Sequence, residues 1–389
     1  MRGKIEATPN GIDNLKDALR FCQNFARFCY SEKTIEEVGE EEYNKILMEK
    51  VLINRGHHSP LEQFTINYVF EDLPKALAMV LNNQKFGGTT EKSARYTFIP
   101  EDLEPKQREK YMKWHSWFQG GIEAKYPESE FPKLYKKGSD GKTPVKKLSQ
   151  ENARYMGSVF IPTRMGHKMD LAYLNKVVYG FKQFIKEERD TPNYFKGELI
   201  KSMQKFIELP EVQRFTYQEG FPQKGGLKLN LFGPANEINY GESVYSANDI
   251  ASFASLAQRH RHRTIDHHII AGYSLGAPLG FFVPPLVEEN NKIAEWRRDL
   301  YEIAKGDIPQ GQLVRFGFSG NTRELPMMTS ERECNNAQLE TNIGITKFLK
   351  RYAKEVPEIR LLIKPDCQKE GCPRGGCYLG PAEYGKRMI

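Results

Sequence analysis

The sequence predicts an α+β protein made of two fused copies of one domain. Apolar residues recur at helical spacing through much of the chain, and short segments alternate as β-strands do. The order of these elements then begins again in the second half. With 39% hydrophobic and 12% aromatic residues, the 389-residue chain can build two cores of ordinary size.

The first half contains helical patterns around one strand-like segment, FTINYVF at 64–70. We expect Asp72 to cap the next helix, with Pro74 in its first turn. A Pro-, Gly-, Lys- and Ser-rich loop is expected at 126–143. Its basic end, 136–147, is interpreted as solvated, with nucleic-acid contact as the alternative. The expected helices are 15–30, 35–53, 76–83, 107–125, from 148 onward, and 170–187.

After the charged stretch 187–192 the order repeats: a helix at 197–208, a strand at 227–232, and a helix at 250–260 that Asn248 or Asp249 caps. Two pairs of residues hold this repeat in register, because Pro60 and Pro234 are as far apart as Gln84 and Gln258. The pair Ile161-Pro162 likewise returns as Ile308-Pro309, each time ahead of a helical segment. We therefore expect domains at 1–190 and 191–389, with the boundary near residue 190.

Composition and charge limit the class of protein. The net charge of +7 is spread along the chain and favours anionic partners such as phosphates. We see no secretory signal and no apolar run of the roughly 20 residues that a membrane span needs, so the expectation is a cytoplasmic protein without a membrane partner. Six cysteines in a chain of this kind do not indicate a disulfide framework.

The densest charge cluster runs from Gln258 to Thr264 and contains Arg261-His262-Arg263. Guanidinium groups bind phosphate in bidentate fashion and stack on planar rings, so this segment suits a dinucleotide cofactor. A solvated basic patch is the alternative. Metal binding by the neighbouring histidines is a weaker one, because His260 and His262 would diverge on a helix.

These residues resemble the flavin-dependent thymidylate synthases. That family carries a Gln, then Arg-His-Arg, then Ser-x-Asn and Ser-x-Arg-Tyr. Gln258 and Arg261-His262-Arg263 match the first part, whereas Asp266 and His268 occupy the Ser and Asn places. Ala271 and Tyr273 fall where the later Ser and Arg are expected.

The first half shows the opposite pattern. Gln84 is not followed by Arg-His-Arg, but Ser93-Ala94-Arg95-Tyr96 matches Ser-x-Arg-Tyr. Residues 26–30 and 56–62 resemble the family's entry motifs. Later in the chain, Asn321-Thr322-Arg323, Arg332 and Ala337-Gln338-Leu339-Glu340 resemble its C-terminal helices, and Lys350 replaces an arginine.

The resemblance implies two fused copies of the flavin-dependent thymidylate synthase fold, an antiparallel sheet packed with helices. It implies FAD as cofactor, with NADPH and methylenetetrahydrofolate as co-substrates, and transfer of a one-carbon unit to C5 of a uracil nucleotide. Two chains would form a homodimer with four repeats. The alternatives are modification of a different pyrimidine nucleotide or nucleic-acid base, or a non-catalytic nucleotide- or nucleic-acid-binding relative.

The same resemblance assigns roles residue by residue. Residues 1–190 keep His-x-Ser-Pro and Ser-x-Arg-Tyr but lack Arg-His-Arg, and residues 191–389 keep Arg-His-Arg, Asn-x-Arg and Ala-Gln-x-Glu. On this resemblance the two halves divide the labour. The catalytic candidates are Arg323, Gln258 and Ser93. The cofactor-binding candidates are Arg261, His262, Arg263, His57, Ser59 and Glu62. The substrate-binding candidates are Gln84, Ser93, Arg95, Tyr96, Arg323 and Lys350.

The tail contains Cys367, Cys372 and Cys377, which resemble no part of the family. Three thiolates are a weak candidate for a zinc or iron–sulfur site. Two residues usually lie between paired cysteine ligands, whereas four lie between successive cysteines here. Reduced surface thiols are the alternative.

Overall fold

The computed structural model divides the chain into two compact units, each built from two chain segments. Unit 1 consists of Met1–Lys92 and Pro162–Gly233, and unit 2 of Ser93–Ile161 and Pro234–Ile389. The boundary expected near residue 190 is therefore not an edge of either compact unit. The residues described are 1–39, 42–48, 53, 58–83, 87–94, 97–191, 193–218, 220–221, 245–260, 265–320, 325–357, 365–368, 377–379 and 386–388.

Unit 1 contains an antiparallel sheet in the order β1-β2-β4-β3. Its strands are β1 (Arg2–Ala7), β2 (Thr65–Pro74), β3 (Thr89–Glu91) and β4 (Pro162–Asp170). Along β4 the buried residues alternate with exposed ones, so one face of the sheet is covered. Phe70 of β2 packs against Phe206 at 5.2 Å between ring centroids, and Phe206 packs against Phe181 at 5.5 Å.

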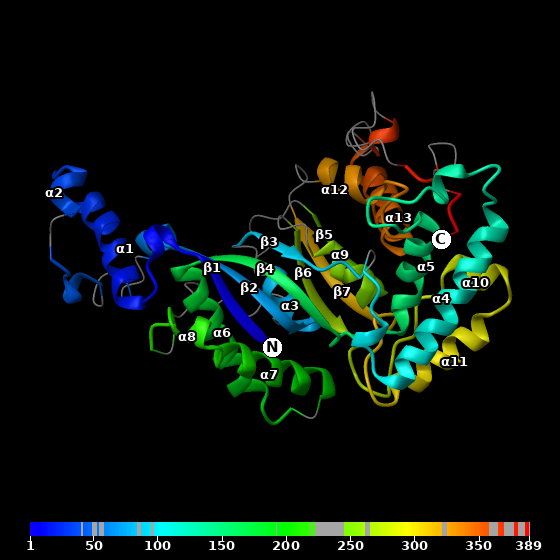
Figure 1. Ribbon diagram of the computed structural model, residues 1–389, viewed down its shortest axis with the longest axis horizontal. Coiled ribbons are helices and arrows are strands. Elements are labelled where there is room, and N and C mark those ends of the chain that lie inside the picture. The colour runs from blue at the N-terminus through cyan, green and yellow to red at the C-terminus, as the bar shows by residue number, and fades with distance from the viewer. Residues whose placement is uncertain are drawn as a thin grey trace. The chain divides into compact units, whose positions relative to one another are not determined.

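Those two rings belong to the helices that cover this face, α7 (Tyr194–Ile207) and α6 (Leu171–Glu188), seen beside the sheet in Figure 1. Asp170 caps α6 by accepting a hydrogen bond from the N–H of Tyr173 at 2.7 Å. The remaining elements of unit 1 are η1 (Pro9–Gly11), α1 (Leu15–Tyr30), α2 (Ile35–Gly39), η3 (Ser59–Gln63), α3 (Lys75–Asn83) and α8 (Pro210–Gln213).

Unit 2 contains a second antiparallel sheet, in the order β5-β7-β6. Its strands are β5 (Tyr245–Ser252), β6 (Ile265–Ala271) and β7 (Leu313–Gly320). The helices α9 (Phe253–Arg259) and α13 (Leu339–Glu355) cover one face. Phe348 of α13 meets Phe318 of β7 at 4.9 Å between ring centroids, and the Arg259 guanidinium lies 5.3 Å from the centroid of Phe316.

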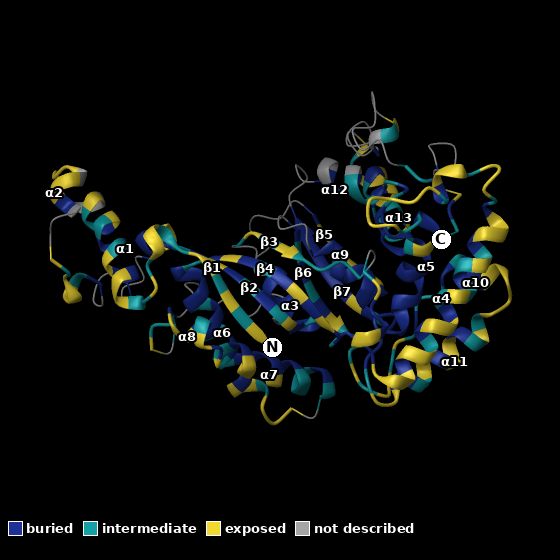
Figure 2. Ribbon diagram, in the orientation of Figure 1, coloured by how far each residue is buried: buried dark blue, intermediate teal, exposed yellow. Residues whose placement is uncertain are grey.

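The rest of unit 2 is mainly helical and packs around buried tryptophans. Trp114 of α4 (Pro105–Lys125) and Trp296 of α11 (Ile293–Ala304) meet edge to face at 4.7 Å. Figure 2 shows the dark, buried sides of these two helices and their exposed outer sides. The other elements of unit 2 are η4 (Pro100–Asp102), η5 (Pro132–Leu134), α5 (Pro144–Ala153), η6 (Arg154–Met156), α10 (Pro285–Glu289), α12 (Leu325–Arg332) and η12 (Asp366–Gln368).

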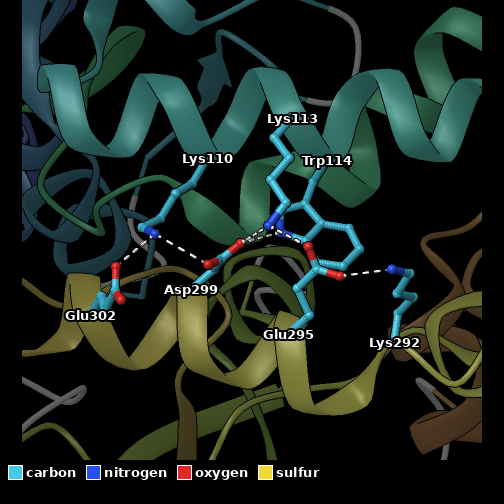
Figure 3. A network of polar contacts seen from close by, with 7 residues as sticks. All are labelled: Lys110, Lys113, Trp114, Lys292, Glu295, Asp299 and Glu302. Carbon is cyan, nitrogen blue, oxygen red and sulfur yellow. Dashed lines mark hydrogen bonds and ion pairs between the residues drawn. The ribbon is translucent and has the colours of Figure 1, made fainter.

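A polar network also joins α4 to α11 (Figure 3). The nearly buried Asp299 carboxylate accepts a hydrogen bond from Trp114 Nε1 at 3.1 Å and forms ion pairs with Lys113 at 2.5 Å and Lys110 at 3.2 Å. Burial alone would raise the pKa of Asp299, but the hydrogen bonds from the two lysines hold it below its usual value. Charge and aromatic packing therefore fix the same helix pair.

Three strands of the unit 1 sheet, β2, β3 and β4, have the same order as the three strands of the unit 2 sheet. In each unit the first of three successive strands leads directly into a helix, the second is an edge strand, and the third lies between them. The middle strands carry Arg164-x-Gly166 and Arg315-x-Gly317, with the glycine at the fifth residue of each strand. A Cβ at Gly166 would lie 2.7 Å from Thr90 Oγ1, and one at Gly317 would lie 2.0 Å from the ring of His268. At both positions a side chain of the edge strand covers the glycine.

The helices expected at 15–30, 107–125, 170–187 and 197–208 are confirmed within a few residues as α1, α4, α6 and α7. Two other predictions are wrong. Residues 245–252 form β5, and Ser252, not Asn248 or Asp249, caps the following helix through the N–H of Ser255. Asp72 lies inside β2 with a φ of 54°, where the register with β4 shifts, so the following helix begins after Pro74.

The helix expected at 35–53 is not continuous, because α2 ends at Gly39, residues 42–44 are not helical, and residues 45–48 are helical again. Gln23 binds this non-helical stretch by donating to the carbonyl of Glu42 at 3.0 Å and accepting from the N–H of Asn44 at 2.5 Å. The strand expected at 227–232 lies outside the described residues. Within the described part of the chain, we find no helix with the length and apolar character of a membrane span.

Candidate functional site

The structure describes five of the expected site residues: Ser59, Glu62, Ser93, Gln258 and Lys350. Several others lie outside the described residues, but the chain on one or both sides of them is described: His57, Gln84, Arg95, Tyr96, Arg261, His262, Arg263 and Arg323. The site is therefore built from these flanking elements.

The end of the unit 2 sheet joins the two arginine-bearing segments of the second half. Ile265 directly follows the segment 261–264, and Gly320 directly precedes the segment 321–324. Ile265 and Gly320 are antiparallel partners across the β6–β7 ladder. Cα atoms of such partners lie about 4.5–5.5 Å apart. Both segments therefore enter or leave the sheet at the same end.

Gln258 lies at the end of α9, next to the same segment. Its side chain is buried, with 8% exposed, and its Oε1 has no hydrogen-bond partner among the described residues. Buried carbonyl oxygens are normally paired, so this acceptor suits an N–H donor that the described protein does not supply. The neighbouring Arg259 is held by an ion pair with Asp249 at 2.6 Å. α9 thus has a fixed end that presents one free acceptor.

A buried carboxylate fixes the other end of α9. Glu340, in the first turn of α13, accepts from the N–H of Ser252 at 2.6 Å, from the Ser252 hydroxyl at 2.5 Å, and from the Tyr155 hydroxyl at 3.1 Å. Gln338 donates to the same Tyr155 hydroxyl at 2.8 Å and accepts a hydrogen bond from Arg154. The Ala337-Gln338-Leu339-Glu340 motif thus connects α13 to the N-terminus of α9 and to η6.

Burial is the main influence on the acidity of this network. It raises the pKa of Glu340, although the hydrogen bonds from Ser252 oppose the rise. It also raises the pKa of Tyr155 well above its ordinary value, and the nearby charge of Glu340 adds to that rise. The Tyr155 hydroxyl therefore keeps its proton at neutral pH, and it cannot act as a base there.

The two residues that depart from the family pattern lie on β6. Asp266 and His268 point to the face opposite the buried His267, and the His268 ring covers Gly317. Burial lowers the pKa of His268, and Asp266 partly offsets this. A neutral imidazole next to a carboxylate therefore replaces the expected Asn and Ser.

In unit 1, Ser59 and Glu62 lie on η3, immediately before β2. Glu62 is exposed and contacts Lys176 of α6 at 3.9 Å. Burial raises the pKa of Asp170 to about 6, the hydrogen bond from Tyr173 opposes this, and the charge of Glu62 adds to the rise. This places a partly protonated carboxyl group beside the entry motif at neutral to mildly acidic pH.

Ser93 begins the first segment of unit 2. Its carbonyl accepts hydrogen bonds from the N–H and the hydroxyl of Thr97, at 3.0 and 2.9 Å. The adjacent Ala94 packs against a hydrophobic cluster that includes Ala254 of α9. Ser93 and the Gln258-bearing helix therefore belong to the same compact unit.

The strand before Ser93 is held in unit 1 by a buried ion pair. Lys75, the first residue of α3, contacts Glu91 of β3 at 2.5 Å, and Asn82 donates to the same carboxylate at 3.2 Å. Lys92 N–H then donates to the carbonyl of Arg164 at 2.9 Å. The chain is thus fixed up to the residue before Ser93.

The remaining candidates stay separate from these groups. Lys350 is exposed on α13. Cys367 and Cys377 are half-buried, and Cys372 lies outside the described residues. In the part of the chain that the structure describes, no group of three or more His, Cys, Asp or Glu side chains is arranged to hold a metal ion.

Three residues around the site, Ser252, Tyr155 and Arg259, were not predicted from the sequence. Ser252 has a local signal, because a serine followed three residues later by Ser255 is compatible with an N-cap. Tyr155 has none, since its partners Gln338 and Glu340 lie far along the chain.

Comparison with known proteins links the first half of the chain to one family. Residues 12–179 match the family model described as "Thymidylate synthase complementing protein". This match includes η3, α3 and the Ser93–Tyr96 segment. Among curated proteins, no match is found.

Solved structures that resemble the chain include flavin-dependent thymidylate synthase ThyX from Helicobacter pylori, complexed with FAD and dUMP. It is 16% identical, covers 57% of this chain and 100% of its own, and has a TM-score of 0.32. Another is the UMP/dUMP methylase PolB from Streptomyces cacaoi bound with 5-Br dUMP, 12% identical, with 46% and 76% coverage and a TM-score of 0.26.

The family match confirms the resemblance that the motifs indicated, and it does so without those structural likenesses. The stretch that this chain shares with the family model, residues 12–179, is similar to the thymidylate synthase complementing proteins.

Proposed function

We propose that the chain is a flavin enzyme that transfers a one-carbon unit to C5 of a uracil nucleotide. Methylenetetrahydrofolate is the proposed carbon donor and NADPH the proposed reductant. The match of residues 12–179 to the family model supports this activity, and so does the order of the motifs in both halves. When bound, reduced FAD supplies the hydride.

The pairing of Ile265 with Gly320 is the observation that carries the proposal. It connects the segment of Arg261, His262 and Arg263 to the segment of Arg323 through one end of one sheet. Guanidinium groups from two segments at one site suit a ligand pair that carries phosphates and flat rings.

The unpaired Oε1 of Gln258 fits such ligands, because it is a buried acceptor without a donor among the described residues. Uracil and the flavin ring both carry a ring N–H between two carbonyl groups, and an amide oxygen accepts from such a donor. We assign Gln258 to orient the pyrimidine ring, and Arg261, His262 and Arg263 to hold the flavin. Ser93, Arg95 and Arg323 are assigned to the nucleotide phosphate.

The other assignments follow the same division. His57, Ser59 and Glu62 are proposed to contact the flavin, and Gln84, Tyr96 and Lys350 the nucleotide. The common strand order of the two sheets and the matching Arg-x-Gly of their middle strands support descent of both halves from one domain. Two chains would then supply the four repeats of the proposed assembly.

The experiment measures binding of deoxyuridylate by equilibrium dialysis in the presence of FAD. Gln258→Ala is expected to weaken binding about tenfold, because it removes one neutral hydrogen bond of about 1–1.5 kcal/mol. Gln213→Ala, at an exposed residue of α8, is the matched control and should leave the affinity unchanged. Equal affinity of the Gln258→Ala variant and the parent protein would remove Gln258 from the site.

A second candidate function keeps the flavin but changes the acceptor. Asp266 and His268 replace the Ser and Asn of the family pattern, and they bring a carboxylate and a neutral imidazole to β6. Another uridine nucleotide, or a base within a nucleic acid, is the expected partner of such a change. Parallel titrations with deoxyuridylate, uridylate and a short oligodeoxyuridylate distinguish the two functions, because the first requires deoxyuridylate to bind most tightly.

A further inference from the structure

A cleft in unit 2 lies between α11 and the loop that follows β6, and we call it the α11 cleft. It has a volume of about 730 Å³ and is lined by α11, residues 278–281 and Leu313. This volume lies within the range of small-molecule sites, roughly 300–1,000 Å³. The cleft lies at the far end of the β7 strand from Gly320, because it is lined by Leu313, the first residue of that strand.

The lining of the α11 cleft is strongly basic. Arg297, Arg298 and Lys305 face it, and in the described part of the chain none of their side chains has an ion pair or hydrogen bond. The one acid of the lining, Glu302, is engaged by Lys110 at 2.9 Å (Figure 3). Three cations thus remain without a countercharge, which favours an anionic ligand.

An aromatic ring lies between these cations. Arg297 and Tyr301 of α11 are four residues apart, and Lys305 follows four residues later as the C-cap of the helix with helical backbone angles. The three side chains therefore leave the helix on one side. With a rise of 1.5 Å per residue, Arg297 and Lys305 are about 12 Å apart along the helix axis, and Tyr301 lies midway between them. Tyr301 is 48% exposed and meets the buried Phe281 edge to face at 6.5 Å.

The exposure of Tyr301 is not a consequence of the packing of α11. The opposite face of the helix is fully used, with Trp296 and Leu300 completely buried. Leu279 across the cleft is also exposed, at 49%. An exposed ring and an exposed aliphatic side chain that line the same cleft offer apolar surface to a flat group.

We propose that the α11 cleft binds a nucleoside bisphosphate, that is, a nucleotide with phosphate groups at two positions of its ribose. Arg297 and Arg298 bind one phosphate, Lys305 binds the other, and the base lies against Tyr301 and Leu279. Arginine suits the bidentate phosphate contact, and a ring–base stack does not depend on the identity of the base. A nucleic-acid strand is less suited, because it requires a groove that continues beyond one base and its phosphates.

This inference does not rest on the proposed function. No residue of the α11 cleft is among those assigned to the flavin and the uracil nucleotide, which we call the Gln258 site. The test uses the full chain and adenosine 2′,5′-bisphosphate as the probe, with adenosine for comparison. The triple variant R297Q/R298Q/K305Q is expected to weaken bisphosphate binding at least about thirtyfold, because charged hydrogen bonds are lost at both ends. Adenosine, which lacks phosphate, is expected to bind weakly to both proteins.

A matched control removes the same number of charges elsewhere in unit 2. K133Q/K136Q/K137Q changes three exposed lysines and should leave bisphosphate affinity within about twofold. The single variant Tyr301→Leu should weaken binding about tenfold while Tyr301→Phe keeps it, because the ring and not the hydroxyl is used. An equal loss in the lysine control would overturn the proposal in favour of nonspecific charge.

Two further results would also overturn it. Binding that disappears in Arg261→Ala/Arg263→Ala, but persists in the α11 variants, would assign the bisphosphate to the Gln258 site. Tighter binding of a hexameric oligothymidylate than of the bisphosphate, lost in the same triple variant, would make the cleft a nucleic-acid site instead.

Discussion

The Ser252 backbone and side chain both bind one carboxylate, that of Glu340. Ser252 is the last residue of β5 and the N-cap of α9, and Glu340 lies in the first turn of α13. The helix that leads to Gln258 therefore begins on a contact between two elements far apart in sequence. The end of α9 can hold a ligand only if this beginning is fixed.

Removing the Glu340 carboxylate should destabilise unit 2. Glu340→Ala leaves the Ser252 N–H and hydroxyl and the Tyr155 hydroxyl without their acceptor, at a cost of about 3–5 kcal/mol. Glu340→Gln keeps one acceptor and should cost about 1–2 kcal/mol. Urea unfolding followed by tryptophan fluorescence measures this in unit 2, since all three tryptophans, Trp114, Trp117 and Trp296, belong to it. Glu340→Ala within about 0.5 kcal/mol of the parent protein would contradict the role of the network.

Gly317 should tolerate no side chain while His268 covers it. Gly317→Ala brings a Cβ to 2.0 Å from the His268 ring, so the ring must move, at a cost of about 1–3 kcal/mol. Adding His268→Ala removes the obstacle, and the double variant should recover part of the loss. Gly120→Ala, in α4 with open space around it, is the control and should stabilise unit 2 by about 0.5–1 kcal/mol. Additive effects of the two substitutions would show that the ring does not lie over Gly317.

Asp170 should make unit 1 less stable as the pH rises from about 4 to 6. Its folded pKa, about 6, lies above the unfolded value of 3.8, so the folded state binds the proton more tightly. The contribution is complete below pH 3.8 and is lost as the pH passes 6, by at most about 3 kcal/mol. Asp170→Asn keeps an acceptor for the N–H of Tyr173 and removes the titration. The difference between variant and parent in unfolding free energy, followed by hydrogen exchange of the β2–β4 ladder, should therefore grow in favour of Asn from about pH 4 to pH 6 and level off above it. A constant difference from pH 4 to 7 would disprove the shift.

Asp299 should contribute more to stability than its neighbour Glu295. Asp299→Ala leaves the buried Trp114 N–H and two lysines without their acceptor, and should cost about 2–4 kcal/mol. Glu295 lies at the solvent side of the same network, paired with Lys113 and Lys292 at 2.8 and 3.0 Å. Glu295→Gln should change stability by less than about 1 kcal/mol. Tryptophan fluorescence reports both variants directly, and equal losses would mean that the surface pairs carry the helix contact.

The helices with strong local signals could be predicted from the sequence. α4 and α6 have apolar residues at helical spacing, and α6 has Asp170 as its cap. β5 was missed because Asn248 and Asp249 are good caps in isolation, and only pairing with β7 makes them part of a strand. Strand pairing depends on partners far along the chain, which no local pattern contains.

The site shows the same division between local and distant information. The motifs identified the family, since their order is a property of the sequence alone. The sequence could not reveal that Ile265 and Gly320 are partners, that Gln258 retains an unpaired oxygen, or that Ala337-Gln338-Leu339-Glu340 binds Ser252. Each of these depends on contacts between distant segments. The interleaving of the two units, with residues 93–161 in the same unit as residues 234–389, likewise has no local signal.

Flavin retention by the purified chain tests the central claim most directly. The protein is mixed with FAD, passed through a desalting column, and its flavin absorbance is compared with that of Arg261→Ala/Arg263→Ala and of the surface control Lys136→Ala/Lys137→Ala. We expect the parent protein and the control to retain about one flavin per Arg-His-Arg motif. The Arg261/Arg263 variant should lose the flavin, while its unfolding free energy, followed by tryptophan fluorescence, stays unchanged. A parent protein that retains no FAD, or an Arg261/Arg263 variant that retains it fully, would contradict the account.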